Sequence, residues 1–161
     1  MSKTVLRDIG NALTGLFGGG QLEPDRRMTL EVLFGLLGYL AKLDSLITSH
    51  EAEFINSLMD KLQLSMRERE VASTALARGR AREMDIVTEI TRYRAVHEPG
   101  APETELLYSS LIKLAAADER LRPKERQFLE TLTEELGYRE EELDRRLQSF
   151  DLIQAAKKST P

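Results

Sequence analysis

The chain has 161 residues, no cysteine, and a formal net charge of −4 from 23 basic and 27 acidic side chains. This length fits one domain, or one domain built from two duplicated halves, and it is sufficient to bury a core without disulfides. The lack of cysteine excludes disulfides and thiolate metal sites, and the acidic balance argues against broad, charge-driven binding to nucleic acid.

The first predicted element is a short amphipathic helix, with apolar side chains at helical spacing between Val5 and Phe17. The sequence GGGQLEPD ends it, so we expect residues 1–25 to form an N-terminal helix and a glycine-rich linker. Residues 4–17 are too short and too charged to span a membrane, which needs roughly 18 apolar residues. We expect this helix to dock on the rest of the chain, with peripheral contact to a membrane or a partner as the alternative. Without a signal-peptide pattern, the expected location is the cytoplasm, membrane association being the alternative.

Seven further helices are predicted, and no segment alternates apolar and polar residues as a strand does. Capping boxes begin helices at Thr48 and Ser65, first-turn prolines begin them at Pro102 and Pro123, and Gly137 follows a helix end. These helices cover residues 26–43, 48–63, 65–79, 83–97, 103–117, 123–136 and 138–150. The predicted fold class is therefore all-α, a single-domain bundle of about eight helices.

The chain contains an internal repeat. The sequence LAKLDSLITSHEAEFINSLMDKL (40–62) aligns without a gap with LAAADERLRPKERQFLETLTEEL (114–136), at an offset of 74 residues. Packing alone would select the repeated apolar positions, and we expect the equivalent rings of Phe54 and Phe128 to be buried between the two halves.

The repeat also sets the predicted domain organisation. The two copies extend over about residues 31–78 and 105–152. We therefore expect one helical domain over residues 26–152, built from two similar helical halves, followed by a flexible tail over 153–161.

Two acidic positions recur along with the apolar ones: Asp44 and Glu51 in the first copy become Asp118 and Glu125 in the second. Each pair flanks a turn between two predicted helices. A carboxylate at a helix start stabilises the exposed N–H groups there, and this capping role explains both positions. The alternative is a divalent-cation site, for Ca²⁺ or Mg²⁺ with carboxylate ligands, or for Zn²⁺ with His50 beside Glu51. An EF-hand is excluded, because position 12 of the loop, counted with each Asp as position 1, holds the apolar Ile55 or Leu129.

The segments LLGYLAKLDSLITSHEAEFINSLMDKL and LIKLAAADERLRPKERQFLETL resemble the TerB-like family, which includes tellurite-resistance TerB proteins and the N-terminal domain of DjlA-type co-chaperones. The resemblance covers about residues 28–150. Family members usually carry glycine after each repeated Asp, where this chain has Ser45 and Glu119. No His-Pro-Asp triplet of a J domain occurs in the sequence. The resemblance implies an adaptor role in a stress response, such as that to tellurite, or a chaperone accessory, and it raises the prospect of metal binding.

No motif predicts an enzyme: the sequence has no glycine-rich phosphate loop and no His-Glu-x-x-His, so no catalytic residue is assigned. The basic run ARGRAR (77–82) is predicted to be a solvated helix end, with a docking patch for an acidic partner as the alternative. His97 is predicted to be a solvent-exposed residue at a helix end. We therefore predict a non-enzymatic interaction domain with a protein partner and no nucleic acid. The alternative is a metal-binding or metal-sensing protein that uses the four repeated acids.

Overall fold

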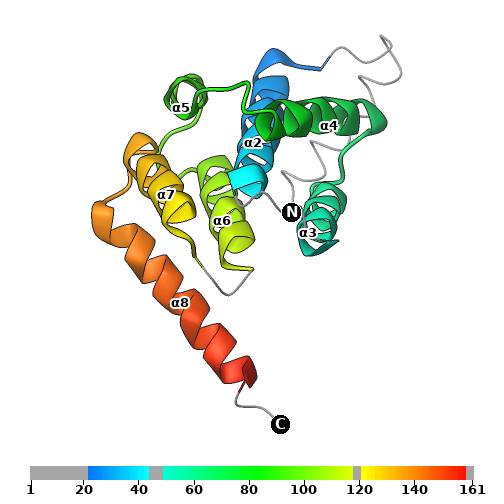
Figure 1. The fold of residues 1–161 in the computed structure, drawn as a ribbon. Helices are drawn as coiled ribbons and strands as arrows, with labels where there is room; N and C mark the ends of the chain where they lie inside the picture. The colour runs from blue at the N-terminus through cyan, green and yellow to red at the C-terminus, as the bar shows by residue number, and fades with distance from the viewer. Residues whose placement is uncertain (1–21, 44–48, 118–120, 159–161) are drawn as a thin grey trace.

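The structure is a computed structural model that describes residues 22–43, 49–117 and 121–158, and side chains up to Phe150 except those of residues 49 and 50. The described residues form seven α-helices and no strand, which confirms the predicted all-α class (Figure 1). The predicted helix between residues 4 and 17 lies outside the described residues. The helices are α2 (Pro24–Leu43), α3 (Ser49–Lys61), α4 (Met66–Arg80), α5 (Ile86–Arg94), α6 (Pro102–Ala116), α7 (Pro123–Glu135) and α8 (Glu140–Lys158). None of these described helices is long and apolar enough to cross a membrane.

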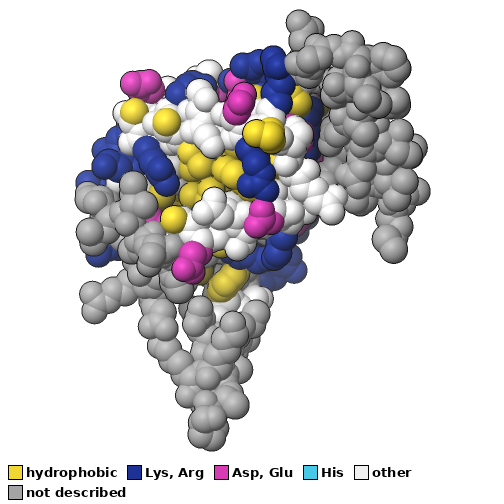
Figure 2. All heavy atoms as spheres, turned by 90° about the vertical axis from the view of Figure 1, so that its right-hand side faces the viewer, with side chains coloured by type: hydrophobic (Ala, Val, Ile, Leu, Met, Phe, Trp, Pro, Cys, Tyr) yellow, Lys and Arg dark blue, Asp and Glu magenta, His cyan; other side chains and the backbone are white. Residues whose placement is uncertain are grey.

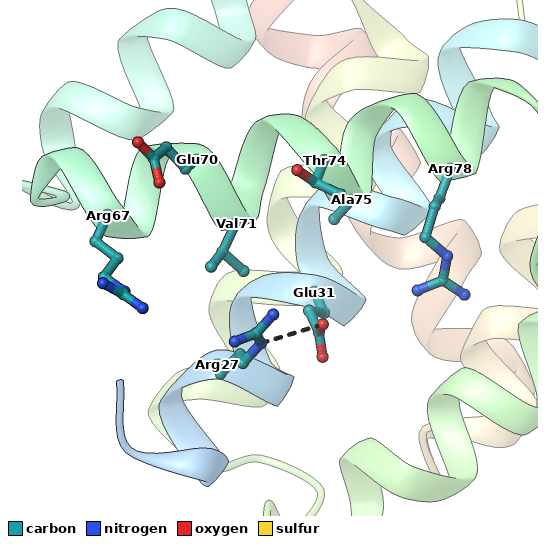
Figure 3. A pocket seen from close by; sticks show the side chains of 8 residues that line it. All are labelled: Arg27, Glu31, Arg67, Glu70, Val71, Thr74, Ala75 and Arg78. Carbon is teal, nitrogen blue, oxygen red and sulfur yellow. Dashed lines mark ion pairs between the residues drawn. The ribbon is translucent and has the colours of Figure 1, made fainter. Parts of the chain in front are cut away.

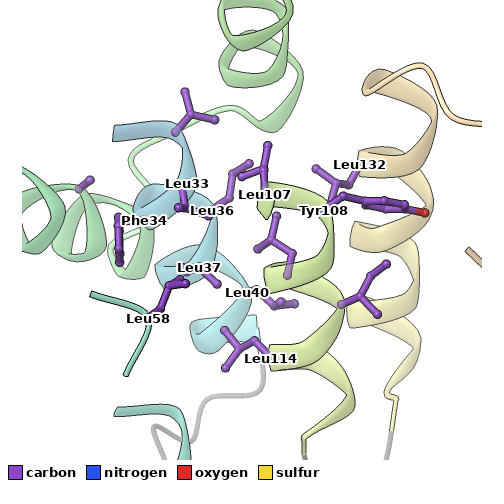
Figure 4. Packing of buried hydrophobic residues seen from close by; sticks show 14 of the residues in the cluster. Leu33, Phe34, Leu36, Leu37, Leu40, Leu58, Leu107, Tyr108, Leu114 and Leu132 are labelled. Carbon is purple, nitrogen blue, oxygen red and sulfur yellow. The ribbon is translucent and has the colours of Figure 1, made fainter. Parts of the chain in front are cut away.

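Helix α2 forms the centre of the bundle, and it contacts α4, α5, α6 and α7 (Figure 1). Its middle is apolar on every side, as expected for a helix that is buried all round. One hydrophobic cluster joins both halves of the chain across α2, α6 and α7 (Figure 4). Its members include Leu33, Phe34, Leu36, Leu37 and Leu40 of α2, Leu107, Tyr108 and Leu111 of α6, and Leu129 and Leu132 of α7.

Glycines bring the backbones of α2 and α4 into direct contact. A Cβ atom added to Gly79 would lie 1.9 Å from the carbonyl oxygen of Gly35, and one added to Gly38 would lie 2.3 Å from the carbonyl oxygen of Leu76. The predicted end of a helix at Gly79 is therefore wrong. This glycine lies inside α4, which continues to Arg80, and it is there because α2 passes too close for a side chain.

The second half of the chain packs differently, because it lacks these glycines. At the offset of 74 residues, Gly35 and Gly38 correspond to Ser109 and Ile112. Helices α6 and α8 accordingly meet through side chains, and a groove of about 360 Å³ remains between them. The two halves are thus similar in sequence but unlike in how closely their first and third helices pack.

Arg146 of α8 links that helix to α6 and to the turn before α8. Its guanidinium donates two hydrogen bonds of 2.9 Å to the carboxylate of Glu105. It also lies 4.6 Å from the ring centre of Tyr108, which stacks on Tyr138. The hydroxyl of Tyr138 donates to Glu105 at 2.6 Å, so one carboxylate holds both a cation and a phenol.

Several helix ends follow the predicted local signals. Ser65 and Glu68 form the expected capping box at the start of α4, with hydrogen bonds of 3.1 and 2.9 Å. Pro102 and Pro123 are the first residues of α6 and α7. Gly137 has a φ of +85° directly after α7, where glycine adopts the left-handed conformation at no steric cost. Thr48, the other predicted cap, lies outside the described residues.

Two helices differ from their predicted limits by three residues or more. Helix α5 begins at Ile86 rather than at residue 83, because Asp85 accepts a hydrogen bond of 3.0 Å from the backbone of Thr88 and caps the helix. Val87, in the first turn of this helix, is 43% exposed. Helix α8 continues to Lys158, beyond the predicted end at residue 150. No glycine or proline interrupts this segment, so the helix takes in most of the predicted tail. The domain limits stay predictions.

The two equivalent phenylalanines have different surroundings. Phe128 is buried at 3% exposure, and its ring stacks on Tyr39 of the first half at 5.7 Å. Phe54 is only half-buried at the edge of the cluster. The prediction of burial is therefore confirmed for Phe128 and wrong for Phe54. The reason is that α7 contacts four other helices, whereas α3 lies at the edge of the bundle (Figure 1).

His97 is half-buried, which corrects its prediction as a solvent-exposed residue. The Thr29 hydroxyl lies 2.7 Å from the carbonyl oxygen of Asp25 and donates to it. That hydroxyl also lies 2.7 Å from Nε2 of His97, so the histidine must donate its Nε2 proton to Thr29. His97 thereby joins the end of the α5 segment to the first turns of α2.

Candidate functional site

The structure describes only half of the predicted metal or capping residues. Glu51 and Glu125 lie in the first turns of α3 and α7, as expected, and Glu125 is buried while Glu51 is half-buried. Asp44 and Asp118 lie outside the described residues. Among the described residues, no group of three or more histidine, aspartate or glutamate side chains could hold a metal ion. The cation site and the capping roles both stay predictions.

The basic run at 77–82 does not form one patch. Arg82 is exposed after the end of α4, with a φ of 58°. Arg78 and Arg80 lie in the last turn of α4, as the predicted helix end requires, and both are half-buried. Of the three, Arg78 lines a groove that also receives arginines from outside the run.

This groove lies between α2 and α4 and has a volume of about 290 Å³ (Figure 3). We call it the α2–α4 groove. Helix α4 supplies four side chains that follow one another at intervals of four, three and four residues along the sequence. These intervals place them on one face of the helix. Helix α2 supplies the opposite wall. The lining residues are Arg27 and Glu31 of α2, and Arg67, Glu70, Val71, Thr74, Ala75 and Arg78 of α4.

Arg92 of α5 is the main partner of the two carboxylates beside the groove. Its guanidinium nitrogens lie 2.8 Å from Glu31 and 3.0 Å from Glu89. Glu89 has a side chain only 6% exposed, and a buried carboxylate requires a close cation. Arg27 and Arg78 approach Glu31 and Glu89 only at 3.6 and 3.5 Å. One terminal nitrogen of Arg78 also donates to the carbonyl oxygen of Glu83 at 3.4 Å, and the remaining N–H groups of the two guanidiniums can serve a ligand in the groove.

Close contacts hold α2 and α4 together near both ends of the α2–α4 groove. Near its start, the fully buried carboxylate of Glu68 accepts a hydrogen bond of 2.7 Å from Arg26 and another from the backbone of Ser65. Towards the other end, the backbones of α2 and α4 touch at Gly35 and Gly79. The two helix backbones that carry the arginines are consequently held against each other, which lowers the entropy cost of binding a ligand.

The chemistry of the groove is that of anion recognition. Arginine binds carboxylate and phosphate groups through paired hydrogen bonds. The floor between the arginines is small and partly apolar, formed by Val71 and Ala75. At about 290 Å³ the groove has room for a few side chains of a protein segment.

Sequence reasoning assigned only Arg78 of this groove, and only as part of the basic run. The spacing of Arg67, Val71, Thr74 and Arg78 was readable as one helix face. The residues of the opposite wall could not be predicted from the sequence, because their position depends on how α2 packs across α4. The glycines that allow this approach are on different helices, and nothing in the local sequence pairs them.

A family model for "Tellurite resistance protein TerB" matches residues 30–148, which is most of the chain. The chain belongs to the TerB family. The matched residues include most of α2, all of α3 to α7, and the first part of α8, so the family domain contains the α4 wall and Glu31 of the α2–α4 groove. Arg27 lies just before the match.

This TerB-family chain is also similar to curated proteins named "Co-chaperone protein DjlA". It is 26% identical to the protein of Vibrio parahaemolyticus over 136 residues, which are 84% of this chain and 48% of that protein. It is 26% identical to the proteins of Shewanella oneidensis, over 81% of this chain and 50% of that protein, and of Yersinia pestis, over 90% and 52%. The chain thus spans about half the length of the curated relatives it matches. No solved structure matches the chain.

Proposed function

We propose that this chain is a non-enzymatic interaction domain that docks a protein partner as an accessory of a chaperone system. The relatives named as co-chaperones support the chaperone setting. The family description favours, as a second setting, an adaptor role in the response to tellurite. Growth of a strain that lacks this chain, compared with and without tellurite, distinguishes the second setting from the first.

The observation that carries the proposal is the α2–α4 groove. It is a fixed concave surface with three arginines, two of which are only loosely paired within the chain. Interfaces commonly combine an apolar centre with a polar rim, and arginine is enriched in them. The face of the molecule drawn in Figure 2 has apolar side chains gathered at its centre with charged ones around them. Met66 is the first residue of α4, the helix that forms one wall of the groove. It is 83% exposed and adds apolar surface at the start of that helix.

Site-specific photo-crosslinking in cells tests this function. A photoreactive amino acid replaces Thr74, an exposed residue in the middle of the α2–α4 groove, and in a control it replaces the exposed Gln148 of α8. We expect discrete adducts from position 74 that contain a chaperone-system protein by mass spectrometry. An absence of adducts at 74, or the same adducts from 148, would contradict the proposal.

A further inference from the structure

We infer that the partner segment bound in the α2–α4 groove is acidic, with two carboxylates that flank a small apolar side chain. The inference rests on the proposed function, because it assigns a ligand chemistry to the same docking surface. It goes further in that it specifies charge, spacing and the kind of side chain between the charges.

The balance of charge around the groove supports an acidic ligand. Four arginines (27, 67, 78 and 92) face three glutamates (31, 70 and 89), which leaves one positive charge in excess. Arg92 provides the short contacts to two of the three glutamates. The longer contacts of Arg27 and Arg78, at 3.6 and 3.5 Å, are the ones that an incoming carboxylate can replace without exposing Glu89.

The placement of the arginines sets the spacing of the ligand's charges. Arg67 and Arg78 are eleven residues apart on α4, which corresponds to about 16 Å along a helix axis. An extended peptide covers this distance in about five residues. Arg27 reaches into the groove from the opposite wall, as Figure 3 shows. A segment with acidic residues about five positions apart can therefore contact cations at both ends.

The side chains on the floor of the groove determine which side chain of the ligand fits between its two carboxylates. Val71, Thr74 and Ala75 separate Arg67 from Arg78 on the α4 wall. These side chains are short, so they leave room for one apolar side chain of the ligand and give a bound base nothing aromatic to stack on. The net charge of −4 on the whole chain also disfavours a polyanion such as nucleic acid. An acidic peptide fits both the arginines and the floor.

Fluorescence anisotropy with synthetic peptides tests the inference. One labelled peptide carries two glutamates about five residues apart around a central leucine, and its matched partner carries glutamines in their place. We expect the glutamate peptide to bind at least about tenfold more tightly than the glutamine peptide. We also expect its affinity to fall as salt rises from about 0.05 to about 0.5 M, because exposed charge pairs are screened.

Variants locate the binding surface. The double substitution Arg27→Gln and Arg67→Gln is expected to weaken the glutamate peptide about tenfold. Arg139→Gln, an exposed arginine outside the groove, removes charge without touching it and should have no effect. Circular dichroism and melting temperature confirm that each variant is folded. Equal binding of the two peptides, or an equal loss with Arg139→Gln, would overturn the inference. Crosslinks from position 74 that persist in the double variant would also overturn it while leaving the proposed function intact.

Discussion

At the scale of single residues, Arg92 controls the electrostatics of the α2–α4 groove. Because it makes the shortest ion pairs with Glu31 and the buried Glu89, the longer contacts of Arg27 and Arg78 are the ones that a ligand can replace. We predict that Arg92→Gln lowers the free energy of unfolding by about 1–3 kcal/mol, since Glu89 loses its closest cation. Urea denaturation measures this change.

The same substitution has a second expected effect. Without Arg92, the guanidiniums of Arg27 and Arg78 should turn to Glu31 and Glu89, and affinity for the glutamate peptide should fall. Arg126→Gln is the matched control, because both partners of Arg126 are exposed and such pairs contribute under about 1 kcal/mol. Equal destabilisation by Arg92→Gln and Arg126→Gln would show that Glu89 does not depend on Arg92.

Phe128 and Phe54 test how much each half contributes to the common core. We predict that Phe128→Ala costs about 3–5 kcal/mol of stability, because the ring is buried against Tyr39. Phe54→Ala should cost clearly less, because that ring is only partly buried at the edge of the cluster. Chemical denaturation of both variants checks the order, and a larger loss at Phe54 would contradict the packing described above.

Tyr138 predicts a dependence of stability on alkaline pH. Burial, followed by the hydrogen bond to Glu105, raises the pKa of Tyr138 to about 12, above its ordinary value of about 10. The protonated phenol is therefore favoured by the native state, and its contribution is complete below pH 10. That contribution is lost as the pH rises towards 12, since the unfolded chain releases the proton first.

Tyr138→Phe lacks this titration. We expect the variant to be less stable at neutral pH by about 1 kcal/mol, because the bond to Glu105 is lost. We also expect its unfolding free energy to fall less steeply than that of the wild type between pH 10 and 12. Denaturation curves across this range measure both slopes, and identical slopes would argue against a raised phenol pKa.

At the scale of helices, the contact between α2 and α4 is expected to make glycine more stable than alanine, which is the reverse of the usual preference inside a helix. In a helix interior, alanine is favoured over glycine by roughly 1 kcal/mol. At Gly38, however, the added Cβ would lie 2.3 Å from the backbone of Leu76. We predict that Gly38→Ala is destabilising by about 1–3 kcal/mol and lowers the melting temperature. Ser109→Ala, at the place on α6 that corresponds to Gly35, should be nearly neutral, and a stabilising Gly38→Ala would disprove the close contact.

Local sequence signals predicted where the helices begin and end better than they predicted which helices pack against each other. The capping box at Ser65, the prolines at 102 and 123, and Gly137 each act within one turn, and each marks a boundary in the structure. Gly79 gave the wrong end for α4 because its role is a contact with another helix. The same residue type thus has two uses, and only the second depends on the tertiary fold.

At the scale of the whole molecule, the internal repeat predicted an all-α fold with two similar halves but not how they differ. Glycine at 35 and 38, against Ser109 and Ile112, lets α4 lie on α2 more closely than α8 lies on α6. The arginines that line the α2–α4 groove are not repeated either, because Ala101, Glu141 and Leu152 stand at the corresponding places, so the candidate site could not be derived from the repeated positions. It arises from positions at which the two copies do not match.

The repeated acids allow a final test that concerns both halves together. If Asp44, Glu51, Asp118 and Glu125 are helix caps, Asp→Asn and Glu→Gln should be mild, because Asn and Gln form the same caps. The melting temperature should then be indifferent to Ca²⁺, Mg²⁺ or Zn²⁺. We predict this outcome, since a carboxylate in the first turn of α3 and α7 already has a structural reason to be there.

Cation binding would give a different result. A cation that binds only the folded chain adds roughly 2.7 kcal/mol of stability at 100 times its Kd, and the neutral substitutions should abolish this gain. Because the acids occur in both halves, the stoichiometry distinguishes two separate sites from one site shared between them. Titration calorimetry on the wild type, on Glu51→Gln and on Glu125→Gln provides the measurement. Saturable binding that either substitution weakens would show that the repeated acids serve a metal and would contradict the capping role.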